Sequence, residues 1–256
     1  MYGLHFYKMK GLLMGKLAKW FDNFWYHYKW TVLIGGFFVI FFLICIMQMV
    51  TREKVDVYVM YTGPAVLSHQ TIKDCESAFR QVMSDDYNGD GEKGIQFLDM
   101  TLMTDEQVAA AKQAAEEDGQ GALMINAKIL SETKTRFNNE IFGGESVICL
   151  LDPAWFESVK DGGGFLPLSE ALGYAPEGAI DEYGIYLHDT DFGSFFGCFD
   201  YLPEDTVLCF RRMTTVTMFK NQKEEQQRWE INKLMLKDLM SFTAPETEAP
   251  AETAGE

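Results

Sequence analysis

The chain has 256 residues, of which 47% are hydrophobic and 23% charged, a composition that excludes wholesale disorder and collagen-like repeats. Its formal net charge of −16 is unevenly distributed, because residues 1–50 hold five lysines against one aspartate and the remaining residues therefore carry −20. A region this acidic repels phosphate backbones, which excludes nucleic acid as a partner.

An apolar run from Trp30 to Val50 contains 21 residues and no charge. As a helix it would be about 31 Å long, which matches the hydrocarbon core of a bilayer at about 30 Å. A buried core helix is rarely apolar on every face. A cleaved signal peptide has a shorter apolar region of about 7–15 residues that ends in small residues, whereas this run ends Met47-Gln48-Met49-Val50. We therefore predict an uncleaved transmembrane helix over residues 30–50.

The flanking charges set the predicted orientation. Five lysines precede the span, whereas Arg52 and Lys54 after it are offset by Glu53 and Asp56. Positive charge remains on the cytoplasmic side of a membrane. We therefore predict a single-pass plasma-membrane protein, with the lipid bilayer as a partner. Its cytoplasmic and interfacial segment is residues 1–29, and its carboxyl-terminal domain lies outside the cell.

The outer region alternates strand and helix signals. Runs of β-branched and aromatic residues predict strands over residues 55–61, 95–102 and 145–151. Helices are predicted between these strands: one capped by Ser68, an Ala-rich one that opens with a capping box at 104–107 and ends at Gly119, and one over 122–138. The alternation predicts a three-layer α/β domain with a mainly parallel sheet over residues 54–242.

The second half of this domain does not continue the regular alternation of strand and helix signals. Asp152-Pro153 predicts the start of a short helix that continues to Val159. Further strands are predicted over 184–187 and 206–213, joined by an aromatic-rich segment, and a long helix over 220–242. Residues 243–256 have no large apolar side chain and are predicted to be a disordered acidic tail.

The five cysteines do not predict a disulfide framework. Cys45 lies in the predicted span, and the other four stand in apolar stretches without paired spacing: Cys75, Cys149, Cys198 and Cys209. Free cysteine is among the residue types most often buried as a small hydrophobe, and we expect that role here. The outer domain must then be held together by its apolar core.

A family resemblance follows from the order of these elements and from "GGGFLPLSEAL" after the Asp-Pro helix. Over about residues 54–172 the chain resembles the amino-terminal lobe of extracellular solute-binding proteins. With "FNNEIFGG", "LLDPAWFE" and "LPEDTVLCFRR" it also looks like single-span, membrane-anchored hypothetical proteins of Gram-positive anaerobes. The second lobe of a solute-binding protein would need well over a hundred further residues. The resemblance therefore implies a lobe-like fold but not transport.

The sharpest local motif is Asp86-Tyr87-Asn88-Gly89-Asp90-Gly91-Glu92. It matches the first half of a calcium loop, with side-chain ligands at Asp86, Asn88 and Asp90 and a backbone carbonyl at Glu92. Calcium takes about 6–8 oxygens, and Phe97 stands where such a loop has its closing glutamate. A plain Asn-Gly/Asp-Gly turn uses the same residues for local hydrogen bonds and is the preferred interpretation. No cofactor other than calcium is predicted.

Catalytic signals are sparse. His188 stands among carboxylates in His188-Asp189-Thr190-Asp191, and a metal or general-base role there would make the chain a cell-envelope hydrolase. Adjacent residues of a strand face opposite sides, which favours a plain turn instead. The sequence lacks a serine nucleophile elbow, an HExxH motif, a phosphate loop and a dinucleotide fingerprint.

These observations predict a non-enzymatic function. We expect a membrane-anchored, extracytoplasmic binding or scaffolding module. Two alternatives remain open: the hydrolase just described, and an accessory subunit of a membrane complex, whose partner would be another membrane protein.

Overall fold

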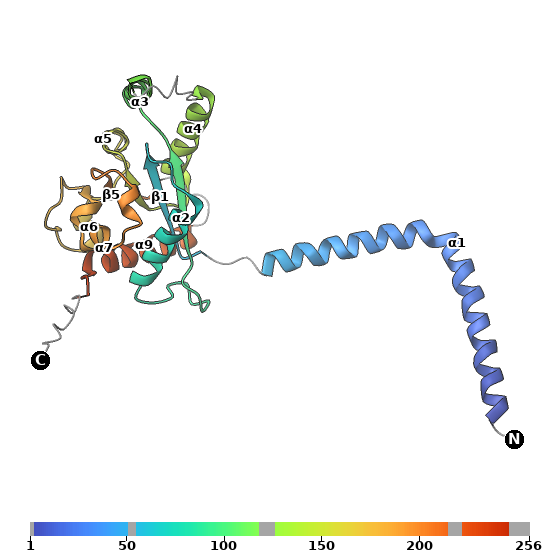
Figure 1. The fold of residues 1–256 in the computed structure, drawn as a ribbon. Helices are drawn as coiled ribbons and strands as arrows, with labels where there is room; N and C mark the ends of the chain where they lie inside the picture. The colour runs from blue at the N-terminus through green and yellow to red at the C-terminus, as the bar shows by residue number, and fades with distance from the viewer. Residues whose placement is uncertain (1–2, 51–54, 118–125, 215–221, 246–256) are drawn as a thin grey trace, which may run out of the picture. The chain divides into compact units, whose positions relative to one another are not determined.

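The computed structural model describes residues 3–50, 55–117, 126–214 and 222–245. The chain separates into two compact units, Met1–Glu53 and Lys54–Glu256. The first unit contains helix α1 (Gly3–Val50), and the described strands all belong to the second (Figure 1). Two predictions concern residues outside the described ranges: the end of the Ala-rich helix at Gly119, and most of the tail over 243–256.

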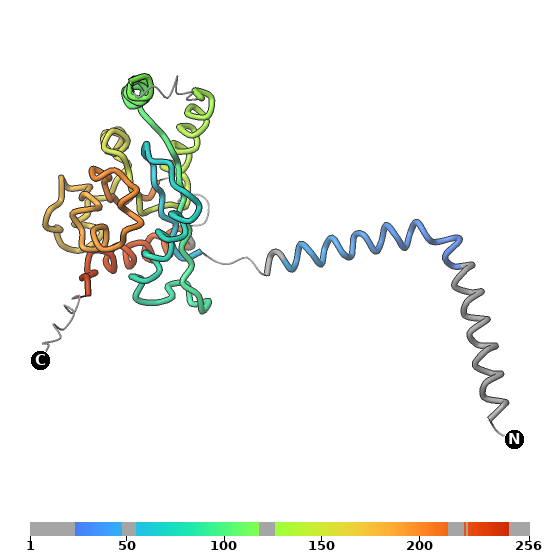
Figure 2. Tube along the Cα trace, viewed as in Figure 1, coloured from blue at the N-terminus to red at the C-terminus, as the bar shows by residue number. Residues whose placement is uncertain are grey.

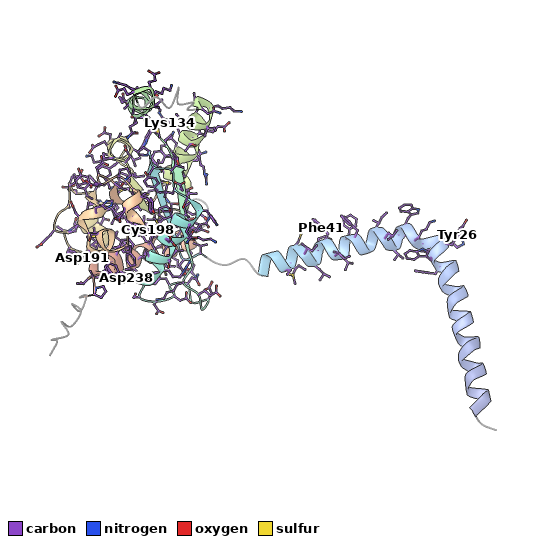
Figure 3. The ribbon with its side chains drawn as sticks, in the orientation of Figure 1. Tyr26, Phe41, Lys134, Asp191, Cys198 and Asp238 are labelled. Atoms are coloured by element: carbon purple, nitrogen blue, oxygen red, sulfur yellow. The ribbon has the colours of Figure 1, made fainter. Side chains whose placement is uncertain are left out.

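Helix α1 contains the apolar stretch anticipated from the sequence. Among the described helices, its segment Phe24–Met47 is long and apolar enough to cross a membrane, with a mean hydropathy of 2.6 and none of the segment buried. The side chains of Tyr26 and Phe41 project outward from it (Figure 3). The lack of burial argues against a core helix. A signal sequence near the amino terminus passes the same test of length and hydropathy. The helix is therefore consistent with an anchor, and its orientation stays a prediction.

The second unit is built on a five-stranded sheet of order β2-β1-β3-β5-β4. Strand β1 pairs in parallel with β2 on one side and with β3 on the other, while β5 is antiparallel to both β3 and β4. The sheet is therefore mostly parallel, which confirms the predicted mixed α/β class. The strands are β1 (Val57–Gly63), β2 (Ile95–Thr101), β3 (Ile148–Leu151), β4 (Gly184–Tyr186) and β5 (Val207–Phe210).

The helix starts follow the capping residues of the sequence. Helix α2 (His69–Val82) begins after Ser68, whose side chain accepts the N–H of Thr71 at 3.0 Å. Helix α3 (Asp105–Glu117) begins with the predicted capping box, because Thr104 and Gln107 each accept the backbone N–H of the other.

Other helices differ from prediction at their ends. Helix α4 (Ala127–Gly143) extends to Gly143 rather than 138, and Asn126 caps its start. Helix α5 (Pro153–Asp161) begins at Asp152-Pro153 as predicted. The aromatic-rich segment after β4 is not a simple connection, because it forms 3₁₀ turns and a short helix. These are η1 (Leu187–Asp189), α7 (Asp191–Phe195) and η2 (Phe199–Tyr201), and the remaining helices are α6 (Leu168–Leu172) and α9 (Gln222–Ser241).

Buried apolar side chains form two clusters, and β1 alternates between them. Val57, Val59 and Tyr61 belong to the first cluster, to which α2, α6, α7 and α9 contribute. Met60 belongs to the second, to which α4 and α5 contribute. All four side chains of β3 are buried, which explains its nearly continuous apolar sequence. Figure 2 traces the backbone through these elements.

A buried arginine holds the turn that precedes β3. Arg211, directly after β5, is 3% exposed, and its guanidinium donates to three backbone carbonyl oxygens. The distances are 3.2 Å to Ile141, 2.9 Å to Gly144 and 2.7 Å to Ser146. Burial lowers the pKa of this guanidinium. These three bonds replace the water that the carbonyls lose on burial, so Arg211 is part of the framework.

Candidate functional site

The carboxyl ends of β1, β2 and β3 lie at one edge of the sheet, because these strands are parallel. The chain leaves β1 toward α2, which packs in the first cluster. It leaves β2 and β3 toward α4 and α5, which pack in the second. Open α/β sheets bind ligands at such a point, where the connections from neighbouring strands diverge to opposite faces. In Figure 1, α3 lies beyond this end of the strands, and α4 runs back alongside them.

This edge contains a hollow of about 370 Å³, within the size range of small-molecule sites. We call it the carboxyl-edge hollow. It is open to solvent and combines an aromatic ring, hydroxyl groups and charges of both signs. Its principal lining residues are Leu102, Thr104, Glu106, Ser131, Lys134 and Trp155.

The indole of Trp155 is fixed in place beside this hollow. Its Nε1 donates to the carbonyl oxygen of Leu102 at 3.2 Å, and the ring of Phe137 packs against it edge-on, with 5.7 Å between centroids. The Nζ of Lys134 lies 5.4 Å from the centroid of the same ring. Figure 3 labels Lys134 on α4, at the end of the domain occupied by α3. A rigid ring with a cation over it is suited to holding a flat, partly polar group.

Asp152 joins the elements that surround this edge. Its Oδ1 accepts the N–H of Ala154 at 2.9 Å and caps α5, while its Oδ2 accepts from Nε2 of Gln107 on α3 at 2.7 Å. Its own N–H donates to the carbonyl oxygen of Thr62 in β1 at 2.9 Å. Asp152, which is 5% exposed, thus contacts β1 through its backbone N–H and both α3 and α5 through its carboxylate.

Two side-chain oxygens near this edge, Oγ1 of Thr62 and Oδ1 of Asp99, are buried and have no hydrogen-bond partner among the described residues. Burial raises the pKa of Asp99, while the charge of Arg136 opposes that shift. Asp99 is in register with Tyr61, whose pKa is raised by burial and whose hydroxyl accepts the N–H of Ala65 at 3.0 Å. Orphaned buried polar atoms are uncommon, and they give this edge unused hydrogen-bonding capacity.

The predicted calcium loop lies at the opposite edge, before β2. Asp86 accepts the backbone N–H groups of Asn88 at 3.2 Å, Gly89 at 2.8 Å and Gly91 at 2.5 Å. These bonds, that of Gly91 foremost, lower the pKa of Asp86. Asn88 accepts from Asp90, and Asp90 from the N–H of Glu92. The four predicted ligands are therefore joined by the local hydrogen bonds that are expected of a turn.

Asp56 completes this loop from the start of β1. It is 3% exposed, and its two oxygens accept the N–H of Asn88 at 2.8 Å and of Gly94 at 2.7 Å. Burial raises its pKa, with a further contribution from the charges of Asp86 and Asp90. Phe97, at the position of the closing ligand, is buried in β2. The sequence indicated the loop but not the role of Asp56.

Within the described residues, no group of three or more His, Cys, Asp or Glu side chains could hold a metal ion. The predicted calcium set also draws on an amide and a backbone carbonyl, so calcium binding there stays a prediction.

The His188 region does not assemble a carboxylate cluster. His188 lies in η1 rather than at a strand end, and its Nδ1 is buried without a partner in the described part of the chain. Asp189 and Asp191 are exposed, and Asp191 begins α7 after Thr190, which accepts the N–H of Gly193. Figure 3 labels Asp191 at this turn. The capping role of Thr190 explains the sequence of this segment.

Comparisons with protein-family models, curated proteins and solved structures give no match to this chain. Sequence reasoning passed over the residues of the carboxyl-edge hollow. The sequence predicts helix starts at Thr104 and Asp152 and assigns no role to Trp155 or Lys134. The available signal was the position of Thr104 directly after β2 and of Trp155 directly after β3, where parallel strands place functional groups; Lys134, on α4, has no such signal.

Proposed function

We propose that the chain is a single-pass plasma-membrane protein whose acidic α/β domain is an extracytoplasmic binding module. Support for the anchor comes from the unburied apolar segment Phe24–Met47 and from the lysines that precede it. Support for a three-layer, lobe-like domain comes from the two apolar clusters, each of which receives helices. The acidic surface keeps such a domain soluble near an anionic envelope.

The observation that carries the binding role is the carboxyl-edge hollow, with the fixed ring of Trp155 beside Lys134 and Glu106. Such a surface suits a small polar molecule with one flat apolar face, because the ring contacts that face while the two charges orient its polar groups. A binding role requires these contacts and no catalytic group.

Binding is tested with the full chain in mild detergent by intrinsic tryptophan fluorescence. Monosaccharides, amino acids and nucleosides serve as probes. We expect one of these classes to give a saturable change that Trp155→Phe abolishes. Trp229→Phe is the matched control, since Trp229 lies on α9, away from the hollow, and this variant should keep the change. Equal responses from both variants, or no saturable response to any probe class, would contradict the proposed site.

Topology is tested with a membrane-impermeant maleimide on intact cells. In a Cys198→Ser background, which removes the accessible native thiol, Glu116, an exposed residue of α3, is replaced in Glu116→Cys, and the control is Lys19→Cys on the predicted cytoplasmic side. We expect labelling of residue 116 in intact cells and of residue 19 only after permeabilisation. The reverse pattern would overturn the orientation.

The hydrolase alternative rests on the unpartnered Nδ1 of His188 alone, because Asp189 and Asp191 are exposed. It predicts an activity against envelope polymers that His188→Ala removes. The accessory-subunit alternative predicts a stoichiometric second membrane protein on purification from mild detergent.

A further inference from the structure

The four cysteines of the second unit fall into two close pairs, although the sequence separates them widely. The thiol of Cys75 in α2 lies against Cys198 and donates to its carbonyl oxygen at 3.9 Å. Cys149 and Cys209 stand directly opposite each other in β3 and β5, and Sγ of Cys209 lies 3.5 Å from the carbonyl oxygen of Cys149. The cysteines are free in the structure.

The two pairs differ in access. Cys75, Cys149 and Cys209 are each 0% exposed. Cys198 is part-exposed and lines a surface hollow of about 450 Å³ together with Asp74, Ser77, Gln81, Phe196 and Tyr201. Figure 3 labels Cys198 in the segment between α7 and η2. A dissolved reagent can therefore reach the first pair through Cys198 and has no comparable route to the second.

The two thiols of the first pair are also chemically unequal. The hydrogen bond from Cys75 lowers the pKa of Cys198 and raises that of Cys75, whose burial raises it further. The charges of Asp74 and Asp200 oppose the first shift, and those of Asp74 and Glu76 add to the second. The thiolate is the reactive form in disulfide exchange. The accessible sulfur is thus the one that is easier to ionise, and the buried sulfur lies behind it.

We propose that Cys75 and Cys198 are a thiol–disulfide switch, in which Cys198 reacts first with a small-molecule disulfide and Cys75 resolves the adduct. The Cys198 thiolate attacks one sulfur of the oxidant, and a mixed disulfide forms as one small thiolate leaves. The sulfur of Cys75 then bonds to Sγ of Cys198 as the second small thiolate leaves, and that thiolate takes the proton of Cys75. Two protein thiols are oxidised and one disulfide is reduced to two thiols. This chemistry goes beyond the proposed function and does not depend on it.

A disulfide bond between Cys75 and Cys198 would tether two distant segments that pack at the first apolar cluster. It would join residues 123 positions apart. Cys75 lies one helical turn before Phe79, and Cys198 directly precedes Phe199. Phe192 packs against both rings, with 5.0 Å between centroids in each pair, and the two rings also contact each other at 5.8 Å. Closing so long a loop restricts the unfolded chain, and we expect a rise in Tm of about 5–15 °C.

The test uses the full chain in mild detergent, reduced, freed of reductant and exposed to oxidised glutathione. We expect a mass loss of about 2 Da, one cross-linked peptide that contains residues 75 and 198, and a higher Tm that dithiothreitol reverses. Cys75→Ser should stop at the mixed disulfide, with glutathione retained on Cys198. Cys198→Ser should remain unmodified at Cys75, and because residue 198 is part-exposed this variant keeps the test informative if the buried substitution prevents folding.

Cys149→Ala is the matched control and should still form the bond between residues 75 and 198. Glutathione retained on wild-type Cys198, a bond between residues 149 and 209 instead, or no reaction of the folded protein would overturn the proposal.

Discussion

The two edges of the parallel strands differ in how they satisfy their polar groups. At the amino edge, Asp56 accepts two backbone N–H groups and Arg211 donates to three backbone carbonyls, although Oγ of Ser146 in the same turn is buried without a partner in the described part of the chain. At the carboxyl edge, Oγ1 of Thr62 and Oδ1 of Asp99 are buried without partners among the described residues. Polar groups that satisfy one another stabilise a fold, whereas buried groups without partners cost stability. The comparison supports a framework role for Asp56 and Arg211 and is consistent with the proposed binding role of the carboxyl edge.

The largest expected effect is the loss of Arg211 from the amino edge. Arg211→Ala should lower the free energy of unfolding by about 3–5 kcal/mol, because it leaves three backbone carbonyls buried and unsatisfied. Urea unfolding measures this change. Arg212→Ala is the matched control, since Arg212 is exposed, and it should change stability by no more than about 0.5 kcal/mol. Similar losses of stability in both variants would contradict a structural role for Arg211.

Asp56 should give the next largest effect. Asp56→Asn retains one acceptor oxygen and turns an NH₂ group toward a backbone N–H, which should cost about 1–3 kcal/mol. Because burial raises the pKa of Asp56, its proton is held more tightly in the folded than in the unfolded state. Its contribution to stability therefore falls as the pH rises from the unfolded value of 3.8 through the higher folded value. The advantage of wild type over the variant should shrink over that range, and a constant advantage would contradict the raised pKa.

Calcium should have a smaller effect at the same edge. A loop with Asp86, Asn88, Asp90 and the carbonyl of Glu92 as its ligands would bind calcium with a Kd of about 0.1–1 mM. A tenfold excess over Kd should then raise Tm by about 3–6 °C, and Asp86→Ala or Asp90→Ala should abolish that rise. Calorimetry with magnesium as the control ion measures it. No rise in wild type would identify the loop as a hydrogen-bonded turn alone.

The smallest expected effect has the opposite sign and lies at the carboxyl edge. Thr62→Val replaces an unpartnered buried hydroxyl with a methyl group of similar size, so it should raise the free energy of unfolding by up to about 1 kcal/mol. A loss of stability in Thr62→Val would show that the hydroxyl is satisfied and would weaken the contrast between the edges.

Local signals in the sequence predicted the elements well. Ser68, the Thr104 capping box and Asp152-Pro153 each mark a helix start that the structure confirms, because a cap depends on residues within one turn. The continuous apolar run before Asp152 indicated β3, because a strand that is buried on both faces has no position for a polar side chain.

Relations between distant residues could not be predicted in this way. The pairing of Cys75 with Cys198, the bonds of Arg211 and the contact of Asp56 with the calcium-like loop each depend on how remote segments pack. The ends of β5 also differ from prediction, because the strand spans Val207–Phe210 and Arg211 beyond it forms an isolated bridge with Phe165. A single sequence carries no direct signal for such contacts.

The position of β5 within the sheet has a consequence for how the chain folds during its synthesis. This strand is the last of the described strands, yet it lies inside the sheet between β3 and β4. When Leu151 has emerged from the ribosome, 55 further residues must follow before Val207 does, which takes about 3–11 s at the usual rate of elongation. During that interval the apolar edge of β3 has no partner on one side. The nascent chain is therefore exposed for several seconds to capture by a chaperone or by another strand edge, and a truncation before Val207 would make that exposure permanent.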